Sequence, residues 1–226
     1  EHFKVLEKRK KWSKIRLEFD SYEGYIDNKQ FEIITKELYQ ELTAAKKHVS
    51  SDLVNFIADS RNNLMTIPIG SSLPFLKNEQ IRVHTSSFTY QGNVLSETLP
   101  KEAIVKQAFL LLNSPYLWGG RTPFGIDCSG FTQLIYKLCG HSLLRDAKEQ
   151  ATQGESLSFI EESEPGDLAF FDNTDGDIIH VGIIMKDYYI IHAHGKVRID
   201  ILDHSGIYNL ETQTHSHKLR VIKKII

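Results

Sequence analysis

One cysteine lies where a glycine-rich segment leads into a predicted helix, and it is the residue best placed to do chemistry. Cys128 follows Trp118-Gly119-Gly120 and stands between Asp127 and Ser129-Gly130. Asp127 is a suitable N-cap, so Cys128 falls in the first helical turn. There the helix dipole favours a thiolate, and free N–H groups can bind a developing oxyanion. The sequence therefore predicts an exposed, ionised nucleophile.

The alternative for Cys128 is a buried structural cysteine, because free cysteines are among the most buried residues. The glycines on both sides favour the nucleophile, since a structural cysteine needs no such clearance. Cys139 follows on the same predicted helix. At a rise of about 1.5 Å per residue the two Cα atoms would be roughly 16 Å apart, too far for a disulfide. We therefore expect two free thiols, and no zinc site built on them.

A histidine on a predicted strand could act as the base for this thiol. Alternation in the run from Ile178 to Met185 places His180 and Gly182 on one face. The glycine leaves room there for another element, which we expect to be the Cys128 helix. A lone strand histidine is more often structural, so the assignment depends on its pairing with Cys128.

Orientation of that imidazole requires a third polar group, and two histidines on the next predicted strand are candidates. His192 and His194 lie on the same face of that strand, so the alternation does not choose between them. The turn suggested by Gly195 slightly favours His192. Tyr116 and Trp118 either pack in the core or line a cleft. In a cleft, the Tyr116 hydroxyl could donate to an oxyanion.

Composition excludes several classes of function. The 226 residues carry 27 Lys+Arg against 29 Asp+Glu, which gives no electrostatic case for a nucleic-acid partner. A group of cations at Lys8–Lys11, Lys14 and Arg16 is explained as the solvated face of a hairpin. No run approaches the roughly 18 apolar residues of a membrane span. The chain begins at Glu1 without a leader, so we expect a processed product.

Short strands separated by turns are expected over the first half of the chain. Strand-like runs occupy 3–6, 12–17 and 22–26, helical composition covers 32–47, and further strands are expected at 52–58, 64–68, 73–76 and 80–90. This spacing suits small β-barrels. We predict one barrel at 1–45, lacking its opening strand, and a second at 46–97.

From Pro100 the pattern changes to helices followed by strands. Apolar periodicity predicts helices at 100–112 and 128–139, and a short third helix is expected at 145–153, ended at Gly154. Strands are expected at 167–171, 178–185, 188–192, 197–202 and 219–225, with connections short enough for an antiparallel sheet. This order is typical of the α+β class, and we predict one such domain at 98–226.

Several motifs together resemble a known family. They are Tyr116-Leu117-Trp118-Gly119-Gly120, Asp127-Cys128-Ser129-Gly130-Phe131, Gly166-Asp167-Leu168, His180-Val181-Gly182-Ile183 and Ile191-His192-Ala193. In order and spacing, residues 100–202 resemble the NlpC-type cell-wall cysteine peptidases. The resemblance implies a papain-like α+β domain in which helices pack on an antiparallel sheet.

The first half is similar to the tandem bacterial SH3-like barrels of one subgroup of that family. The similarity rests on Asp20-Ser21-Tyr22-Glu23-Gly24-Tyr25 and Leu64-Met65-Thr66-Ile67-Pro68. The subgroup is the γ-D-glutamyl-L-diamino acid endopeptidases, also called dipeptidyl-peptidase VI. It implies two small SH3-like barrels in front of the peptidase domain.

The resemblance also assigns roles. The implied catalytic residues are Cys128 as nucleophile, His180 as base, His192 as the third polar residue and Tyr116 as oxyanion donor. Asp146 would bind the free amine of an N-terminal L-Ala, with Ala147 where the subgroup has serine. The rest of the expected substrate-binding set is Tyr22, Trp118, Ser129 and Glu1.

The implied reaction is hydrolysis of the bond between γ-D-Glu and the diamino acid in peptidoglycan stem peptides that have a free N-terminal L-Ala. No metal or cofactor is expected. The expected partners are muropeptides, and the expected form is a monomer in the cell envelope or secreted, in the periplasm in particular, or alternatively cytoplasmic in peptide recycling. Two other functions stay open: a wall-binding protein with a degenerate peptidase domain, and a Cys/His amidase or acyltransferase on another substrate.

Overall fold

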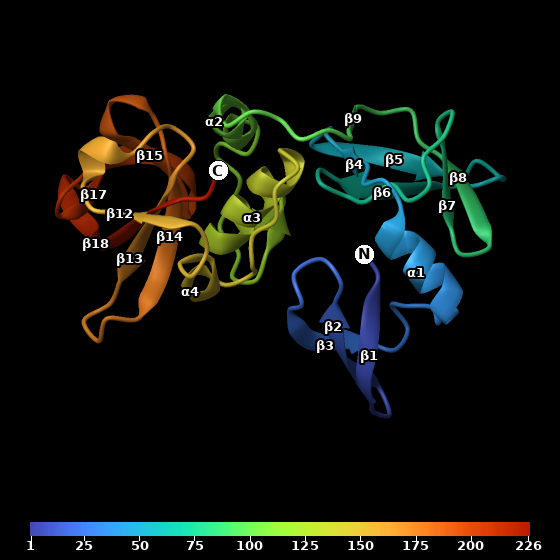
Figure 1. Cartoon of the computed structure of the whole chain (residues 1–226). Helices are drawn as coiled ribbons and strands as arrows, with labels where there is room; N and C mark the ends of the chain where they lie inside the picture. Colours follow the sequence, from blue (N-terminus) through green and yellow to red (C-terminus); the bar gives the residue numbers. More distant parts are fainter. The chain divides into compact units, whose positions relative to one another are not determined.

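The computed structural model describes residues 1–226, which form two compact units, Glu1–Ser96 and Glu97–Ile226. Strands dominate both units (Figure 1). None of the helices combines the length and hydropathy that a membrane-spanning helix needs.

The first unit begins with an antiparallel three-stranded sheet. Its strands are β1 (Phe3–Lys8), β2 (Trp12–Leu17) and β3 (Glu23–Asp27), paired in that order. Helix α1 (Lys36–Ala44) follows, and the Thr35 hydroxyl caps it by accepting the Leu38 N–H. The start of this unit therefore agrees closely with the runs predicted from the sequence.

A second group of strands completes this unit around its own apolar cluster. A four-stranded sheet has the order β6-β5-β8-β7, and a short pair lies beside it; the strands are β4 (Val49–Ser50), β5 (Val54–Ala58), β6 (Leu64–Pro68), β7 (Gln80–Val83), β8 (Ser86–Thr89) and β9 (Val94–Leu95). Ile57, Leu73, Ile81 and Tyr90 form the buried cluster.

Two predictions for this region are wrong. The segment 73–76 is a turn and not a strand: Leu73 is buried, but Phe75 has a φ of 55°, which ends any extended run. The run 80–90 is a hairpin of β7 and β8, with a turn at His84, whose φ is 52°. The turn at His84 contains none of the usual turn residues, whereas Pro74 marks the turn at Phe75, a signal that the sequence analysis missed.

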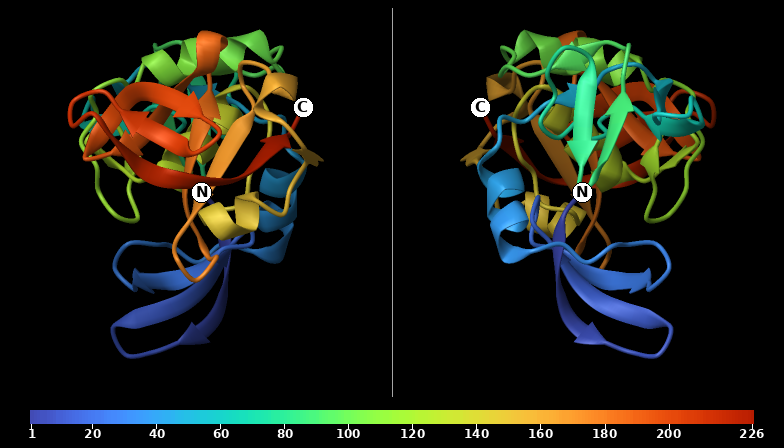
Figure 2. Two further views of the ribbon diagram at one scale, coloured as in Figure 1. Left: turned by 90° about the vertical axis from the view of Figure 1, so that its left-hand side faces the viewer. Right: turned by 90° about the vertical axis from the view of Figure 1, so that its right-hand side faces the viewer.

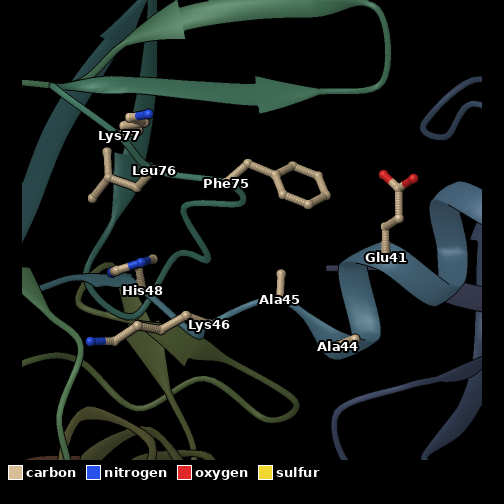
Figure 3. A pocket seen from close by; sticks show the side chains of 8 residues that line it. All are labelled: Glu41, Ala44, Ala45, Lys46, His48, Phe75, Leu76 and Lys77. Carbon is tan, nitrogen blue, oxygen red and sulfur yellow. The ribbon is translucent and has the colours of Figure 1, made fainter.

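A pocket of about 640 Å³ lies within the first unit. Its walls come from the end of α1, the segment that follows it, and the turn at Phe75 (Figure 3). None of the residues with a predicted role lines it, and it belongs to the unit that does not contain Cys128.

In the second unit, six antiparallel strands close into a barrel (Figures 1 and 2). A meander of five strands comes first, and the sixth pairs with both ends of it; the strands are β13 (Leu168–Asp172), β14 (Ile178–Ile184), β15 (Tyr189–His194), β16 (Lys196–Asp203), β17 (Gly206–Asn209) and β18 (Thr214–Lys224). Strand β12 (Glu155–Leu157) extends the edge at β18. Phe171, Ile190, Leu202 and Ile207 belong to one buried cluster.

The predicted antiparallel sheet is present, and its closure into a barrel was not predicted. Strand β18 pairs with β17 through residues 214–218 and with β13 through residues 218–223. The sequence prediction omitted β17 and began the last strand at residue 219. Without the first half of β18, nothing joined the two edges of the sheet.

Three helices accompany the barrel. They are α2 (Glu102–Phe109), α3 (Cys128–Leu138) and α4 (Ala147–Gln150). Helix α3 is buried along almost its whole length and packs on β14, β15 and α2. The predicted helix at 145–153 is shorter than expected, because it begins only after Asp146, its N-cap with an extended backbone, and ends at Gln150.

Candidate active site

One buried carboxylate fixes the start of α3. Asp127 caps the helix as predicted, because its Oδ1 accepts the Gly130 N–H at 2.6 Å. Its Oδ2 accepts the Gly119 N–H at 2.8 Å. Arg145 donates to both oxygens, at 3.1 and 2.6 Å, and both side chains of this ion pair are buried. Cys128, the first residue of α3, is thereby held against the Gly-Gly loop and the segment before α4.

Gly130 and Gly182 make room for neighbouring atoms other than the Cys128 sulfur. A Cβ on Gly130 would lie 2.4 Å from the Gly120 carbonyl oxygen, so the loop and the helix are in main-chain contact. A Cβ on Gly182 would lie 2.9 Å from the His192 Cβ and closer still to Ile190. The space at Gly182 is therefore taken by β15, and the prediction that the Cys128 helix fills it is wrong.

The Cys128 sulfur is buried, and the prediction of an exposed, ionised thiol is wrong. Its residue is only 7% exposed. Burial, followed by the charge of Asp127, raises the pKa of the Cys128 thiol to about 11, although the N–H groups of Val181, Ser129 and Cys128 itself donate toward the sulfur. Desolvation therefore outweighs the helix terminus, and the resting group is a neutral thiol.

A chain of buried polar side chains starts one residue before Val181. His180 Nε2 lies 2.8 Å from His192 Nδ1, and His192 Nε2 lies 3.0 Å from Asp200 Oδ2. All three residues are at most 4% exposed. His194, the other candidate for the third polar group, is exposed on the same strand. The local pattern could not choose between the two histidines; the structure joins His192 to His180.

The Cys128 sulfur lies beside the strand that carries His180 and near Tyr116. The Val181 N–H that donates to the Cys128 sulfur belongs to the residue directly after His180. Burial, and then the negative charge that Cys128 would carry, raise the pKa of the Tyr116 hydroxyl, so this phenol lies within electrostatic reach of the sulfur. This arrangement can carry out nucleophilic attack on a carbonyl with proton transfer to an imidazole.

A fourth histidine, which the sequence analysis missed, covers His180. The His217 ring stacks on the His180 ring with centroids 4.1 Å apart and 22° between the planes. Burial, with neighbouring imidazoles, lowers the pKa of His180 well below its usual value and that of His217 to about 4. His217 lies in β18 between two irregularities of pairing, so no alternation pattern could place it.

The predicted substrate-binding residues have different surroundings. Asp146 is half-buried at the start of α4, and burial, then Glu149, raise the pKa of its carboxyl. Trp118 is 85% exposed, so the alternative that it packs in the core is wrong. The buried Ser129 hydroxyl accepts from Arg145 at 3.0 Å. Tyr22 and Glu1 lie in the first unit, and all these roles stay predictions.

Comparison with known proteins finds two family models that match parts of the chain. The model of the NlpC/P60 family matches residues 113–218, and that of the bacterial dipeptidyl-peptidase Sh3 domain matches residues 1–31. Residues 113–218 form an NlpC/P60 domain. The match agrees with the family that the motifs resemble.

Two relatives share the name gamma-D-glutamyl-L-lysine dipeptidyl-peptidase. The chain is 31% identical to the one from Bacillus cereus over 174 residues, 74% of this chain and 50% of that protein. It is 39% identical to the one from Bacillus subtilis over 94 residues, 41% of this chain and 31% of that protein. The chain thus spans half or less of these relatives.

A solved structure supports the fold. The crystal structure of an NlpC/P60 family protein from Bacillus cereus superposes with a TM-score of 0.81 at 21% identity, covering 99% of this chain and 79% of that one. The papain-like peptidase fold with an SH3 domain is thereby confirmed.

We expect the Cys128 thiol to ionise only in alkaline solution, because burial raises its pKa to about 11. The ultraviolet absorbance of a thiolate should be absent near neutral pH and appear as the pH approaches that value. The difference spectrum against Cys128→Ala removes the contribution of Cys139, the other buried thiol. Thiolate absorbance at neutral pH that disappears in Cys128→Ala would contradict a neutral resting thiol.

We expect the free energy of unfolding to fall as the solution is acidified. Burial lowers the pKa of His180, His192 and His217 in the folded chain, so below pH 6.5 the unfolded chain binds more protons. Each such histidine then removes up to about 1.4 kcal/mol per pH unit. Denaturant titrations at several pH values measure this.

Carboxylates also titrate in acid. The contribution of the histidines to the pH dependence of the unfolding free energy is therefore isolated by comparing variants. His217→Gln should make the dependence between pH 6.5 and about 4 less steep. His204→Gln, whose side chain is 73% exposed, should leave it unchanged. Equal slopes in the wild type and in His217→Gln would rule out this histidine as a source.

Proposed function

We propose that this protein is a cysteine endopeptidase that hydrolyses the bond between γ-D-Glu and the diamino acid of peptidoglycan stem peptides with a free N-terminal L-Ala. The observation that carries the proposal is the donation of the Val181 N–H to the Cys128 sulfur, one residue after the hydrogen-bonded His180. The NlpC/P60 match and the names of the relatives support the substrate class.

Catalysis starts from an uncharged pair. The Cys128 thiol and the His180 imidazole are both neutral near pH 7, because burial raises the pKa of the thiol and lowers that of the imidazole. The sulfur attacks the γ-carbonyl carbon while His180 takes its proton. The Tyr116 hydroxyl and the main-chain N–H of Cys128 donate to the resulting oxyanion.

The same histidine completes both halves of the reaction. His180 returns the proton to the amine of the diamino acid as the C–N bond breaks, leaving a thioester on Cys128. It then takes a proton from water, whose oxygen attacks the thioester carbonyl and releases the free γ-carboxylate and the thiol. His192 holds the His180 ring through both steps.

Specificity for a free amine is assigned to Asp146. Burial and Glu149 raise the pKa of this half-buried carboxyl, so a bound ammonium group would stabilise its charged form. A substrate without that amine would leave the carboxylate desolvated without a cation. Ala147, at the first position of α4, offers no hydroxyl to the substrate.

We assign domain boundaries at 1–45 and 46–97 for two SH3-like barrels and 98–226 for the peptidase. The first is supported by the Sh3 match to residues 1–31, and the second by its own buried cluster around Leu73 and Tyr90. Tyr22, Glu1, Trp118 and Ser129 are proposed as further substrate contacts. The proposed setting is a monomer in the cell envelope or outside the cell, acting on muropeptides.

Replacing Cys128 with Ala should abolish turnover. Removing the nucleophile is expected to lower kcat by about 1,000-fold or more, because the thiol that forms the thioester is lost. The substrate is L-Ala-γ-D-Glu-diamino acid, and mass spectrometry of the products measures cleavage. Cys139→Ala, which removes the other buried thiol, is the matched control and should keep activity.

The outcomes separate the candidate functions. Turnover retained by Cys128→Ala would overturn the mechanism. Wild-type protein that binds the peptide without cleaving it would instead indicate a wall-binding protein with a degenerate peptidase domain. Products from another amide of a muropeptide mixture would indicate an amidase or acyltransferase.

Acetylation of the L-Ala amine should lower kcat/KM by about 10- to 100-fold, because the Asp146 carboxylate then lacks its cation. Asp146→Asn should lower kcat/KM for the free-amine peptide to a similar degree. In this variant, acetylation should have little further effect, since both changes remove the same interaction between residue 146 and the L-Ala amine.

Asp187→Asn, at an exposed position of the same unit, is the control and should respond to acetylation as the wild type does. An acetylated peptide cleaved as fast as the free amine by the wild type would remove Asp146 from the amine site.

A further inference from the structure

The hydrogen-bonded chain that begins at His180 ends on a fully buried, clamped carboxylate. Asp200 on β16 is 0% exposed and accepts from His192 Nε2 at 3.0 Å. Arg198 donates to both of its oxygens, from Nε at 2.7 Å and from Nη2 at 3.0 Å. The Leu210 N–H donates to Oδ1 at 3.0 Å. Asp200 therefore accepts hydrogen bonds from β15, from β16 and from the turn after β17.

The clamp on Asp200 is itself anchored. Arg198 also donates to Glu211 at 2.8 Å and to the Asn209 side-chain oxygen at 3.1 Å. Burial alone would raise the pKa of Asp200, but the hydrogen bonds from His192 and Arg198 hold it well below its usual range. Asp200 is thus a permanent anion, and an ionised carboxylate accepts hydrogen bonds but never donates them.

Because Asp200 can only accept hydrogen bonds, it determines which ring nitrogen of His192 and of His180 carries a hydrogen. Since Asp200 can only accept, His192 Nε2 carries a hydrogen, and the neutral His192 ring then has a bare Nδ1. His180 Nε2 lies 2.8 Å from that nitrogen and must donate to it. The neutral His180 ring is therefore left with a lone pair on Nδ1, the nitrogen that is free to take a proton from Cys128.

We propose that Asp200 is a positioning residue of the active site, which sets the tautomers of His192 and His180 so that His180 Nδ1 is the catalytic base. This role rests on the proposed function, in which His180 accepts the thiol proton. Asp200 touches no substrate. Its effect passes through two imidazoles, and Arg198 keeps it charged.

A purely structural role for Asp200 would not require this polarity. A neutral amide of the same shape could hold the same place. In Asp200→Asn, however, the amide oxygen fits best at Oδ1, because two fixed donors, Leu210 N–H and Arg198 Nη2, point there and only one, Arg198 Nε, points at the Oδ2 position. The amide NH₂ would then face His192 Nε2 and donate to it. The direction of each hydrogen bond between residue 200, His192 and His180 would then reverse. His180 Nδ1 would carry a hydrogen and could no longer act as a base.

The first measurement needs no variant and no substrate. Nitrogen NMR of the imidazole rings distinguishes protonated from bare nitrogens, and His180→Gln and His192→Gln assign the two rings. In wild-type protein near neutral pH, both rings should show a bare Nδ1 and a protonated Nε2. A protonated Nδ1 on either neutral ring would overturn the proposal.

The second measurement is kinetic. Asp200→Asn should lower kcat by about 100-fold or more, with KM changed by no more than about two-fold, because the base is lost while binding contacts remain. The same variant should show a protonated His180 Nδ1 by NMR. Asp203→Asn is the matched control on the same strand, since Asp203 binds the surface residue His215 at 2.8 Å, and it should change neither readout.

The outcomes distinguish this proposal from the proposed function. If wild-type protein cleaves no stem peptide but shows the expected tautomers, which Asp200→Asn reverses, the substrate assignment fails and the positioning role stands. If Asp200→Asn folds, keeps a bare His180 Nδ1 and keeps the wild-type kcat, Asp200 is only structural and the role fails. Should that variant not fold, the wild-type tautomers still decide.

Discussion

The arrangement of the site depends on the buried carboxylate of Asp127. It binds the Gly119 N–H of the loop that follows Tyr116, the Gly130 N–H of α3, and the Arg145 guanidinium next to Asp146. Three segments far apart in sequence are thus fixed to one charged group. Because breaking a buried ion pair leaves an unpaired charge at a cost of about 3–5 kcal/mol, these segments hold their places together.

The same carboxylate affects the chemistry of its neighbour. Burial, and then the negative charge of Asp127, raise the pKa of the Cys128 thiol and outweigh the N–H donors at the helix terminus. Burial, and then the nearby imidazoles, lower the pKa of His180 and keep its ring neutral. The site therefore holds no charge on its reacting atoms at rest, and the charges form only during attack, when the oxyanion donors are already in place.

The parts of the site that depend on local sequence could be predicted, and those that depend on strand pairing could not. The Asp127 cap, the place of Cys128 in the first turn and the strand of His180 follow from a few neighbouring residues. The role of Asp200 depends on the register that pairs His192 with Arg198. The His217 stack and the barrel closure depend on β18, whose first half the pattern missed. Burial of the sulfur is likewise a property of packing.

Barrel closure connects these missed features to one another. Strand β18 brings His217 onto the face of His180, and the turn after β17 carries Leu210 and Glu211, which bind Asp200 and Arg198. Without β17 and the first half of β18, which the sequence analysis missed, Asp200 would lose a main-chain donor and His180 would lose the ring that covers it. An ionised carboxylate and a neutral imidazole can be buried a few ångströms apart only because the last two strands surround both.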